Sequence, residues 1–292
     1  MIYEQCKDKI ELRITELNGI LKNFPSVEGN ICTTKDMIWK RKNICNLASR
    51  CNLVLEIGFN AGHSAIHFLE SNPNLHLYCF DIGYHLYTDP CYQYLSKIYG
   101  DRIHMKYGNS TVTIPKFFKK NPDLKFDMYH IDGCHLTDVA LQDLNNCYEH
   151  ARMCNQPLDK PSNPKLGTHF FIKQELYDVN SWKEWYKRPW VIFDDIDMPE
   201  LNSLWYDFCG KNKIWEVDLY DYNLFPTLNF KHGIGMFTQD THMVDVEWYR
   251  SYYTDLYGLR TPEQVYSHWK TYGCKEGRFP NAYLLSLYKN DH

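Results

Sequence analysis

Three aspartates stand where two predicted buried strands end. Asp132 closes "FDMYHID" (126–132), and Asp194 and Asp195 close "WVIFDD" (190–195). If these strands are neighbours in a parallel sheet, their carboxyl ends meet at one edge, and three carboxylates gathered there would repel one another. A divalent cation relieves that repulsion, and hard oxygen ligands at this density suit Mg²⁺. The sequence therefore predicts a metal site made by Asp132, Asp194 and Asp195.

A metal at this position would activate a hydroxyl nucleophile. Coordination to a dication lowers the pKa of a hydroxyl group, and a nearby base then removes its proton. In "HIDGCH", Cys134 and His135 follow Asp132. A neutral thiol is a weak base, whereas histidine titrates near the working pH. We therefore assign the base to His135. Asp132, which would hold the metal, is the second predicted catalytic residue. The simpler alternatives are a helix N-cap contact for His135 and strand-end solvation for the aspartates.

A second pattern, "VLEIGFNAGHSA", joins an apolar strand to a glycine-containing turn. Gly58 and Gly62 would let a ligand approach the backbone, because no Cβ stands in the way. Asp81 ends the next strand, and its carboxylate can accept hydrogen bonds from ribose hydroxyls. A dinucleotide turn needs G-x-G-x-x-G, and Asn60 stands at its middle position. Glu56 suits the sulfonium of S-adenosylmethionine (SAM) better than a pyrophosphate. An ordinary tight turn is the alternative.

Strands and helices alternate along most of the chain, which predicts an α/β fold with a doubly wound, seven-stranded, mostly parallel, Rossmann-like sheet. The predicted strands are 53–57, 75–81, 103–108, 126–132, 190–195, 214–220 and 232–238. The predicted helices are 2–22, 35–48, one ending near 70, 91–98, 111–120, 136–150 and 199–209. The last two strands have no helical spacer, so we expect them to form an antiparallel pair at one edge.

Three regions are predicted from this pattern. Residues 1–50 form an N-terminal helical extension, 51–240 the sheet domain, and 241–292 a small C-terminal helical module. The segment 155–189 is long for a loop, and unstructured stretches of this length are usually functional or disordered. Its "NSWKEWYKRPW" carries three Trp. It is interpreted as a substrate lid, with a surface insertion as the alternative.

Composition excludes several classes of partner. The net charge is −4 without a basic tract, so we expect no nucleic-acid partner. The start of the chain lacks the apolar region of a secretory signal, and no stretch is long and apolar enough to span a bilayer. The 11 cysteines show no CxxC spacing, which fits reduced thiols and a cytoplasmic location.

The motifs "VLEIGFNAGHSA", "CFDIG", "YGNS" and "FDMYHIDGCHLTDVALQDL" resemble class I SAM-dependent methyltransferases over about residues 50–238. More narrowly, they are similar to the macrocin- and novobiocin-type sugar O-methyltransferases, whose metal-dependent relatives hold a cation with the matching aspartates. Two departures stand out: Cys134 replaces a common acid, and Asn109 replaces the Asp of "GDS". The resemblance implies a cofactor site formed by Glu56, Gly58, Phe59, Asn60, Gly62, Asp81, Asn109 and Ser110.

The C-terminal region resembles a small module found beside glycosyltransferases and other polysaccharide-modifying enzymes, including some from large DNA viruses. A helical cap that protects the sheet edge is the alternative interpretation. The match is carried by Tyr253, Asp255, Leu256, His268, Trp269, Tyr272, Gly273, Glu276, Gly277 and Arg278.

Together these patterns predict a SAM-dependent O-methyltransferase that acts on a sugar hydroxyl, in a glycan or nucleotide sugar, with a divalent cation. The alternatives are an inactive methyltransferase fold that binds a glycan, and a catechol-type O-methyltransferase. The expected partner is the sugar or glycan substrate, without a membrane. The N-terminal extension suggests a homodimer by fold-level analogy. The expected location is the cytoplasm, which would be the host cytoplasm for a viral protein.

Overall fold

The computed structural model describes residues 2–28, 37–154, 189–211, 213–216, 232–237, 244, 246–273, 276 and 278. The proposed lid segment therefore lies outside the described residues, except for Pro189. Within the described residues, no helix is both long and apolar enough to cross a bilayer.

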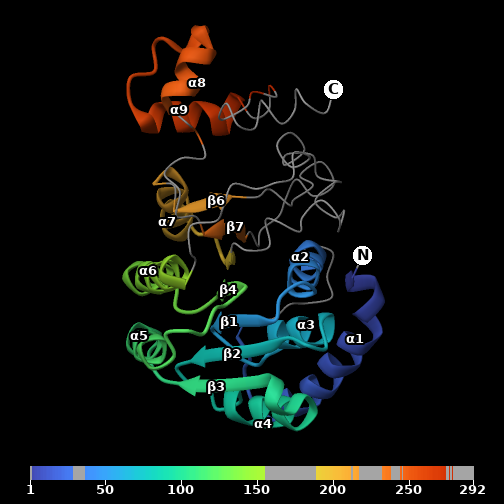
Figure 1. Ribbon diagram of the computed structural model, residues 1–292. Helices are drawn as coiled ribbons and strands as arrows, with labels where there is room; N and C mark the ends of the chain where they lie inside the picture. Colours follow the sequence, from blue (N-terminus) through green and yellow to red (C-terminus); the bar gives the residue numbers. More distant parts are fainter. Residues whose placement is uncertain are drawn as a thin grey trace.

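A seven-stranded sheet forms the centre of the molecule, in the order β3-β2-β1-β4-β5-β7-β6 (Figure 1). The strands are β1 (Leu53–Ile57), β2 (His76–Asp81), β3 (Ile103–Tyr107), β4 (Met128–Ile131), β5 (Trp190–Phe193), β6 (Ile214–Glu216) and β7 (Gly233–Phe237). The first five strands are parallel to one another, and β7 is antiparallel to both β5 and β6. The predicted doubly wound sheet and its antiparallel edge are confirmed.

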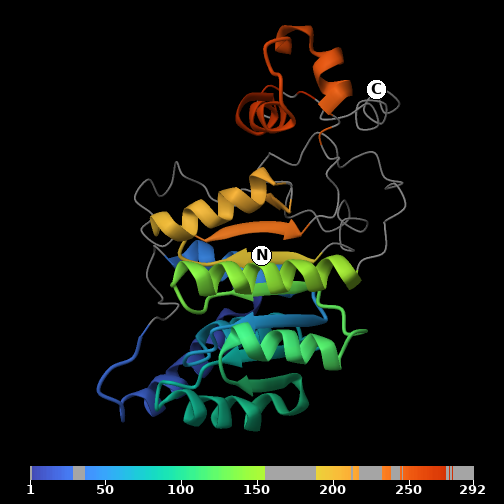
Figure 2. The ribbon, with the colours of Figure 1, turned by 90° about the vertical axis from the view of Figure 1, so that its left-hand side faces the viewer.

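Helices cover both faces of the sheet. Those that pack on the sheet are α1 (Ile2–Leu21), α2 (Ile38–Ala48), α3 (His63–Ser71), α4 (Thr88–Tyr99), α5 (Ser110–Lys120), α6 (Thr137–Cys154) and α7 (Pro199–Gly210), whereas α8 (Val246–Tyr252) and α9 (Pro262–His268) belong to the C-terminal region. One apolar core joins α1 to α4 with the sheet, and a second joins α5 to α7 with its other face (Figures 1 and 2).

Alternation along β1 divides its side chains between these two cores. Val54 belongs to the core under α1 to α4, whereas Leu55 and Ile57 belong to the core under α5 to α7. Strands of a parallel sheet are buried on both faces, so both sets are apolar. Strand order reverses between β1 and β4, and open α/β sheets bind ligands at the carboxyl ends beside such a point. The fold therefore defines where a site should lie.

The N-terminal helices belong to the main core. Tyr3, Ile10 and Leu17 of α1 lie in the same apolar cluster as Ala65 and Phe68 of α3. Both α1 and α2 contact α3 directly. The extension therefore brings α2 close to the sheet, where it contributes to the site described below.

The C-terminal region has a small core of its own, which includes Tyr249, Val265 and Trp269. Arg278 donates to Asp255 through two guanidinium nitrogens at 2.9 and 2.8 Å, and the Trp269 indole donates to the Arg278 carbonyl at 3.4 Å. A Cβ on Gly273 would lie 2.0 Å from the Tyr249 hydroxyl oxygen. The sequence motif of this module is thus used for its own packing, and a glycan-related role remains a prediction.

Candidate functional site

The glycine turn after β1 is required by the packing of the protein itself. Gly58 has φ +91°, and a Cβ there would lie 1.8 Å from the backbone carbonyl oxygen of Asp132. Gly62 has φ +87°, and a Cβ there would lie 2.6 Å from the Phe59 ring and 2.7 Å from Leu95. Both positions need a residue without a side chain. The turn after β1 therefore lies directly against the turn after β4.

Two residues of the predicted cofactor set are buried instead of facing a ligand. Glu56 is fully buried on the α3 side of β1, where its carboxylate accepts a hydrogen bond from Ser64. Its other neighbours are Cys79 Sγ at 3.4 Å and His130 Nδ1 at 3.3 Å. Phe59 is also buried, with its ring 6.2 Å from that of Tyr92. The side chains of Glu56 and Phe59 therefore lie in the core of the described structure, and their assignment to the cofactor site stays a prediction.

Asp81 stands at the carboxyl end of β2 beside this turn. Its Oδ2 accepts from the Asn60 backbone N–H at 2.8 Å, and its Oδ1 accepts from Gly83 N–H at 2.7 Å. Asn60 has φ +53°, and its side-chain amide donates to the Glu28 carbonyl at 2.6 Å. Asparagine tolerates this left-handed backbone better than most residues. Asp81 and Asn60 are therefore held together beside the glycine turn, and the ribose role of Asp81 stays a prediction.

The start of α5 also lies near the carboxyl edge of the sheet. Asn109 is the N-cap of α5, and its Oδ1 accepts from Thr111 N–H at 3.0 Å. Ser110 donates through its hydroxyl to Asp143 Oδ2 at 3.0 Å. Burial raises the pKa of the Asp143 carboxyl to about 6, with the Ser110 hydrogen bond opposing the shift. The Asp-to-Asn departure at position 109 thus retains a helix-capping side chain.

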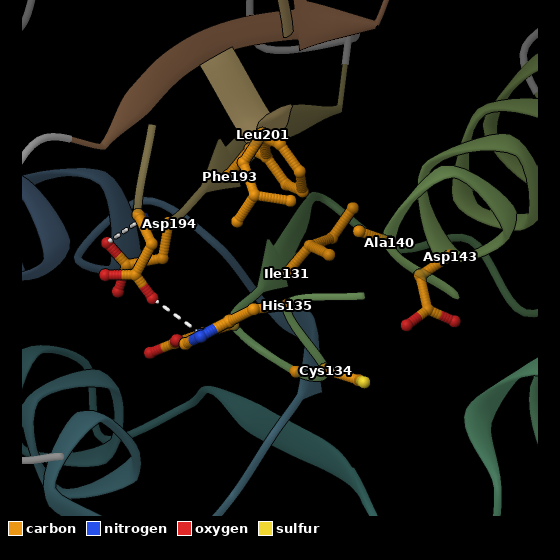
Figure 3. Close-up of a pocket in the computed structure, with 11 residues that line it drawn as sticks. Ile131, Cys134, His135, Ala140, Asp143, Phe193, Asp194 and Leu201 are labelled. Atoms are coloured by element: carbon orange, nitrogen blue, oxygen red, sulfur yellow. Dashed lines mark hydrogen bonds and ion pairs between the residues drawn. The ribbon is translucent and has the colours of Figure 1, made fainter. Parts of the chain in front are cut away.

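The three aspartates converge as predicted. Strands β4 and β5 are neighbours with Ile131 opposite Phe193, so Asp132 and the Asp194–Asp195 pair follow at the same edge. The backbone N–H of Asp132 donates to Ile57 at 2.9 Å, which continues the ladder past the strand end. Asp132, Asp194 and Asp195 line a small pocket between the strand ends, α6 and α7, in which Figure 3 shows Asp194 and His135.

Asp195 pairs with the predicted base. Its φ is +54°, a left-handed conformation that aspartate tolerates. His135 Nε2 lies 2.8 Å from Asp195 Oδ2, the ion pair drawn as a dashed line from His135 in Figure 3. This contact raises the pKa of His135 and lowers the pKa of Asp195. The His135 side chain is 50% exposed, so solvent screens part of both effects. His135 is therefore accessible and oriented by a carboxylate.

Asp194 has a partner that the sequence analysis missed. The ammonium group of Lys40, on α2, donates a hydrogen bond to Asp194 and lies 3.7 Å from Asp132 Oδ2. The Lys40 side chain is only 9% exposed, and that of Asp194 only 5%. Lys40 precedes the buried Ile44 and Ala48 at helical spacing, so it lies on the core-facing side of α2. In the sequence the only signal was the basic run Lys40-Arg41-Lys42, which lies far along the chain from both acidic strand ends.

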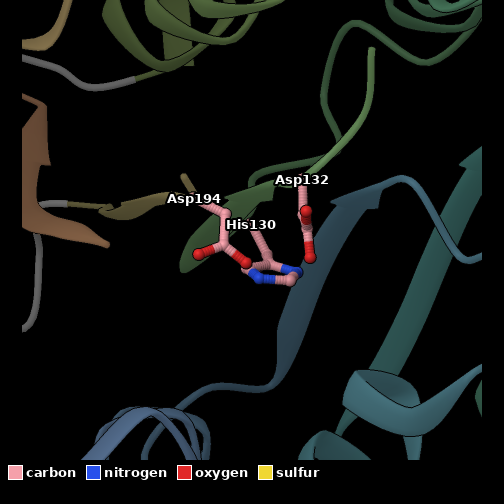
Figure 4. A group of neighbouring side chains, drawn as sticks. All are labelled: His130, Asp132 and Asp194. Atoms are coloured by element: carbon pink, nitrogen blue, oxygen red, sulfur yellow. The ribbon is translucent and has the colours of Figure 1, made fainter. Parts of the chain in front are cut away.

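His130, on β4, lies between Asp132 and Asp194 (Figure 4). Among the described residues, two groups of side chains have potential ligand atoms within 4.8 Å of one another. One group is His130, Asp132 and Asp194, and the other is Asp132, His135 and Asp195. The predicted trio of aspartates is thus divided between two groups, and Lys40 or His135 already contacts each of its members. As they stand, these residues do not fit the predicted magnesium ion.

Part of this chain is similar to a known family of proteins. Residues 55–153 match the family model described as a methyltransferase domain. This stretch runs from β1 into α6 and contains the glycine turn, Asp81, Asp132 and His135. No curated protein sequence matches the chain.

Several solved structures resemble the chain in fold. An O-methyltransferase from Bacillus cereus in complex with SAH is 10% identical, with a TM-score of 0.47 over 79% of this chain and 91% of that one. TomG, an O-methyltransferase from Streptomyces achromogenes in complex with SAM, is 11% identical, with a TM-score of 0.48 over 78% and 90%. CalS11, a calicheamicin methyltransferase, is 13% identical, with a TM-score of 0.47 over 79% and 93%. Likenesses this distant carry no information about cofactor or substrate.

Proposed function

We propose that the protein is a SAM-dependent O-methyltransferase that transfers a methyl group to a hydroxyl of a sugar, in a glycan or nucleotide sugar. The observation that carries the proposal is the contact between two turns. The Gly58 turn, where a nucleoside would bind, lies against the Asp132 backbone, two residues before Cys134 and three before His135. A methyl donor and a base would thus meet at one edge of the sheet.

The cofactor half of the proposal rests on Asp81, Asn60 and the start of α5. Asp81 is anchored by two backbone N–H groups, which leaves its remaining lone pairs to accept from ribose hydroxyls. Asn109 and Ser110 begin α5 at the same edge, where an adenine ring would lie. Bound SAM would supply an activated methyl group on a sulfonium centre.

In the acceptor half, His135 is the proposed base. If Nε2–H donates to Asp195 at 2.8 Å, the imidazole carries its lone pair on Nδ1. Nδ1 then accepts the proton of the acceptor hydroxyl as the oxygen becomes a nucleophile, and Asp195 stabilises the imidazolium that forms. Proximity and orientation would supply much of the remaining rate.

The sugar acceptor rests on the sequence resemblance and on exposed apolar and aromatic side chains in the loops that follow the carboxyl ends of β4 and β2. Leu136, next to His135, is 69% exposed, and Tyr84 in the loop after β2 is 82% exposed. Apolar and aromatic side chains at the mouth of a site can pack on the apolar faces of a sugar ring. A catechol would use the same surfaces, so the acceptor has to be decided by experiment.

Two measurements test the proposed function. Calorimetry should detect SAM binding to the full-length protein, and transfer of a labelled methyl group should be strongest to sugars or nucleotide sugars in a panel that includes catechols. Absence of SAM binding would favour the alternative of an inactive fold that binds a glycan. SAM binding with transfer only to catechols would reject the sugar acceptor and retain the methyltransferase.

A further inference from the structure

Lys40 occupies the position where a metal ion was expected. We infer that the Lys40 ammonium, and not a divalent cation, neutralises Asp132 and Asp194, so that this acidic edge functions without a metal. The inference deepens the proposed function. Its first part, that Lys40 excludes a divalent cation, is argued from the contacts alone. Its second part, that catalysis at this edge needs no metal, rests on the proposed function.

The position of Lys40 is built into the fold. Its helix, α2, contacts α3, and α3 follows directly from the glycine turn. The aliphatic part of the Lys40 side chain lies on the same buried face of α2 as Ile44. The ammonium group therefore points toward the ends of β4 and β5. An ammonium group this deeply buried is costly unless it is paired and hydrogen-bonded. Asp194, itself almost fully buried, provides the partner, and Asp132 lies within 3.7 Å of the same nitrogen.

The reason for expecting a metal was repulsion among three carboxylates, and the protein's own cations reduce it. Lys40 contacts Asp194 and Asp132, and His135 contacts Asp195. Asp194 Oδ2, which would be a ligand atom, already accepts from Lys40. A dication placed between Asp132 and Asp194 would lie close to the ammonium and be repelled by it. Binding of a metal at this position would therefore require Lys40 to leave.

If Lys40 were absent, His130 would complete a set of possible metal ligands with Asp132 and Asp194. It lies between Asp132 and Asp194, with Nδ1 directed to Glu56 at 3.3 Å. Its buried Nε2 has no hydrogen-bond partner among the described residues. Two carboxylates and an imidazole nitrogen form a mixed oxygen and nitrogen set that could hold a divalent transition metal, and Mn²⁺, which carboxylates bind, serves as a paramagnetic probe of that set. Lys40 thus acts as a positioning residue: its ammonium pairs with the two carboxylates and prevents a metal from binding to them.

Manganese binding by the full-length protein tests the inference directly. Wild-type protein stripped with EDTA, Lys40→Met and Lys40→Arg would be titrated with Mn²⁺ and followed by electron paramagnetic resonance. Methionine retains the apolar stem without the charge, and arginine retains the charge. We expect Lys40→Met to bind Mn²⁺ at least about tenfold more tightly than the wild type and Lys40→Arg, a difference of about 1.4 kcal/mol. Asp194→Asn in the Lys40→Met background should abolish the gain.

Two results would overturn the inference. The first is Mn²⁺ binding by the wild type that is as tight as in Lys40→Met and is lost in Asp194→Asn. The second is equally weak binding by the wild type and a folded Lys40→Met. If Lys40→Met fails to fold, the wild type decides: micromolar Mn²⁺ binding that depends on Asp194 rejects the inference, and its absence supports it. SAM calorimetry in EDTA is a separate readout, so failure of the methyltransferase proposal would be recognised independently.

Discussion

The two halves of the candidate site are held in different ways. In the nucleoside half, the turn after β1 is fixed by backbone: Gly58 lies against the Asp132 carbonyl, and Asp81 accepts from two backbone N–H groups. In the acceptor half, the strand ends are fixed by side-chain ion pairs, Lys40 with Asp194 and His135 with Asp195. A residue whose backbone is packed against another backbone can rarely be substituted, whereas charged side chains can form new ion pairs when one partner is changed. Substitution of the turn glycines in the nucleoside half should therefore cost stability, whereas substitution of the base in the acceptor half should cost activity.

The largest effect is expected from Gly58→Ala. Its Cβ would stand 1.8 Å from a backbone oxygen, and neither turn can move without displacing β1 or β4. We expect a loss of more than about 4 kcal/mol of unfolding free energy or failure to fold. Gly100→Ala is the matched control, since Gly100 also has positive φ, +59°, with nothing within 4 Å of a Cβ. Its strain should cost about 1–3 kcal/mol. Equal stability of the two variants in urea unfolding would contradict the contact.

In the acceptor half, His135→Gln should lower kcat by about 10²–10⁴-fold, because the base is lost. The side chain is half exposed, so the melting temperature should change little. Cys134→Ala is the comparison, since the thiol was the other possible base, and it should retain most of the activity. Greater loss in Cys134→Ala than in His135→Gln would reject the assignment of the base.

In both halves, the sequence predicted which residues lie at the sheet edge better than it predicted the contacts of individual side chains. Alternating strands and helices placed Asp81, Asp132 and Asp194 at one edge, because parallel strands align their carboxyl ends. Pattern alone could not show that Glu56 faces inward, since a buried carboxylate is recognised only from its partners, here Ser64 and His130.

Lys40 was missed for a related reason. It lies 154 residues from Asp194 in sequence, and a lysine at the start of a helix usually indicates an exposed face. Its pairing depends on how α2 packs, which is a tertiary property. Asp195 adds a second example: its left-handed φ, which the sequence does not reveal, lets consecutive acids serve different partners.

Asp81→Asn tests whether the nucleoside half binds through this carboxylate. Asparagine can accept from only one of the two backbone N–H groups with its single oxygen. We expect SAM affinity to fall by about 10–100-fold, in line with about 1.5–3 kcal/mol for a hydrogen bond to a charged group. Asp89→Asn, on the exposed first turn of α4, is the control and should leave calorimetric SAM affinity within about twofold. Unchanged SAM affinity in Asp81→Asn would remove the ribose role.

The smallest effect concerns Asp143, which lines the pocket behind the acceptor half. Its folded pKa is about 6 against an ordinary 3.8, so the unfolded chain releases the proton first as pH rises. The contribution of Asp143 to the free energy of unfolding therefore falls between about pH 4 and pH 6, and it stays at this lower value at higher pH. Asp143→Asn removes the buried charge and should be more stable than the wild type by about 3 kcal/mol at pH 8.

At pH 4 this advantage should disappear, because the wild-type carboxyl is then protonated in the folded protein. Asp123→Asn, in an exposed turn, is the control and should stay within about 0.5 kcal/mol of the wild type at both pH values. Urea unfolding at pH 4 and pH 8 measures all three proteins. A pH-independent difference for Asp143→Asn would mean that the Ser110 hydrogen bond, and not buried charge, governs this position. In that case hydrogen bonds, and not charges, would stabilise the region behind the acceptor half, as they do in the nucleoside half.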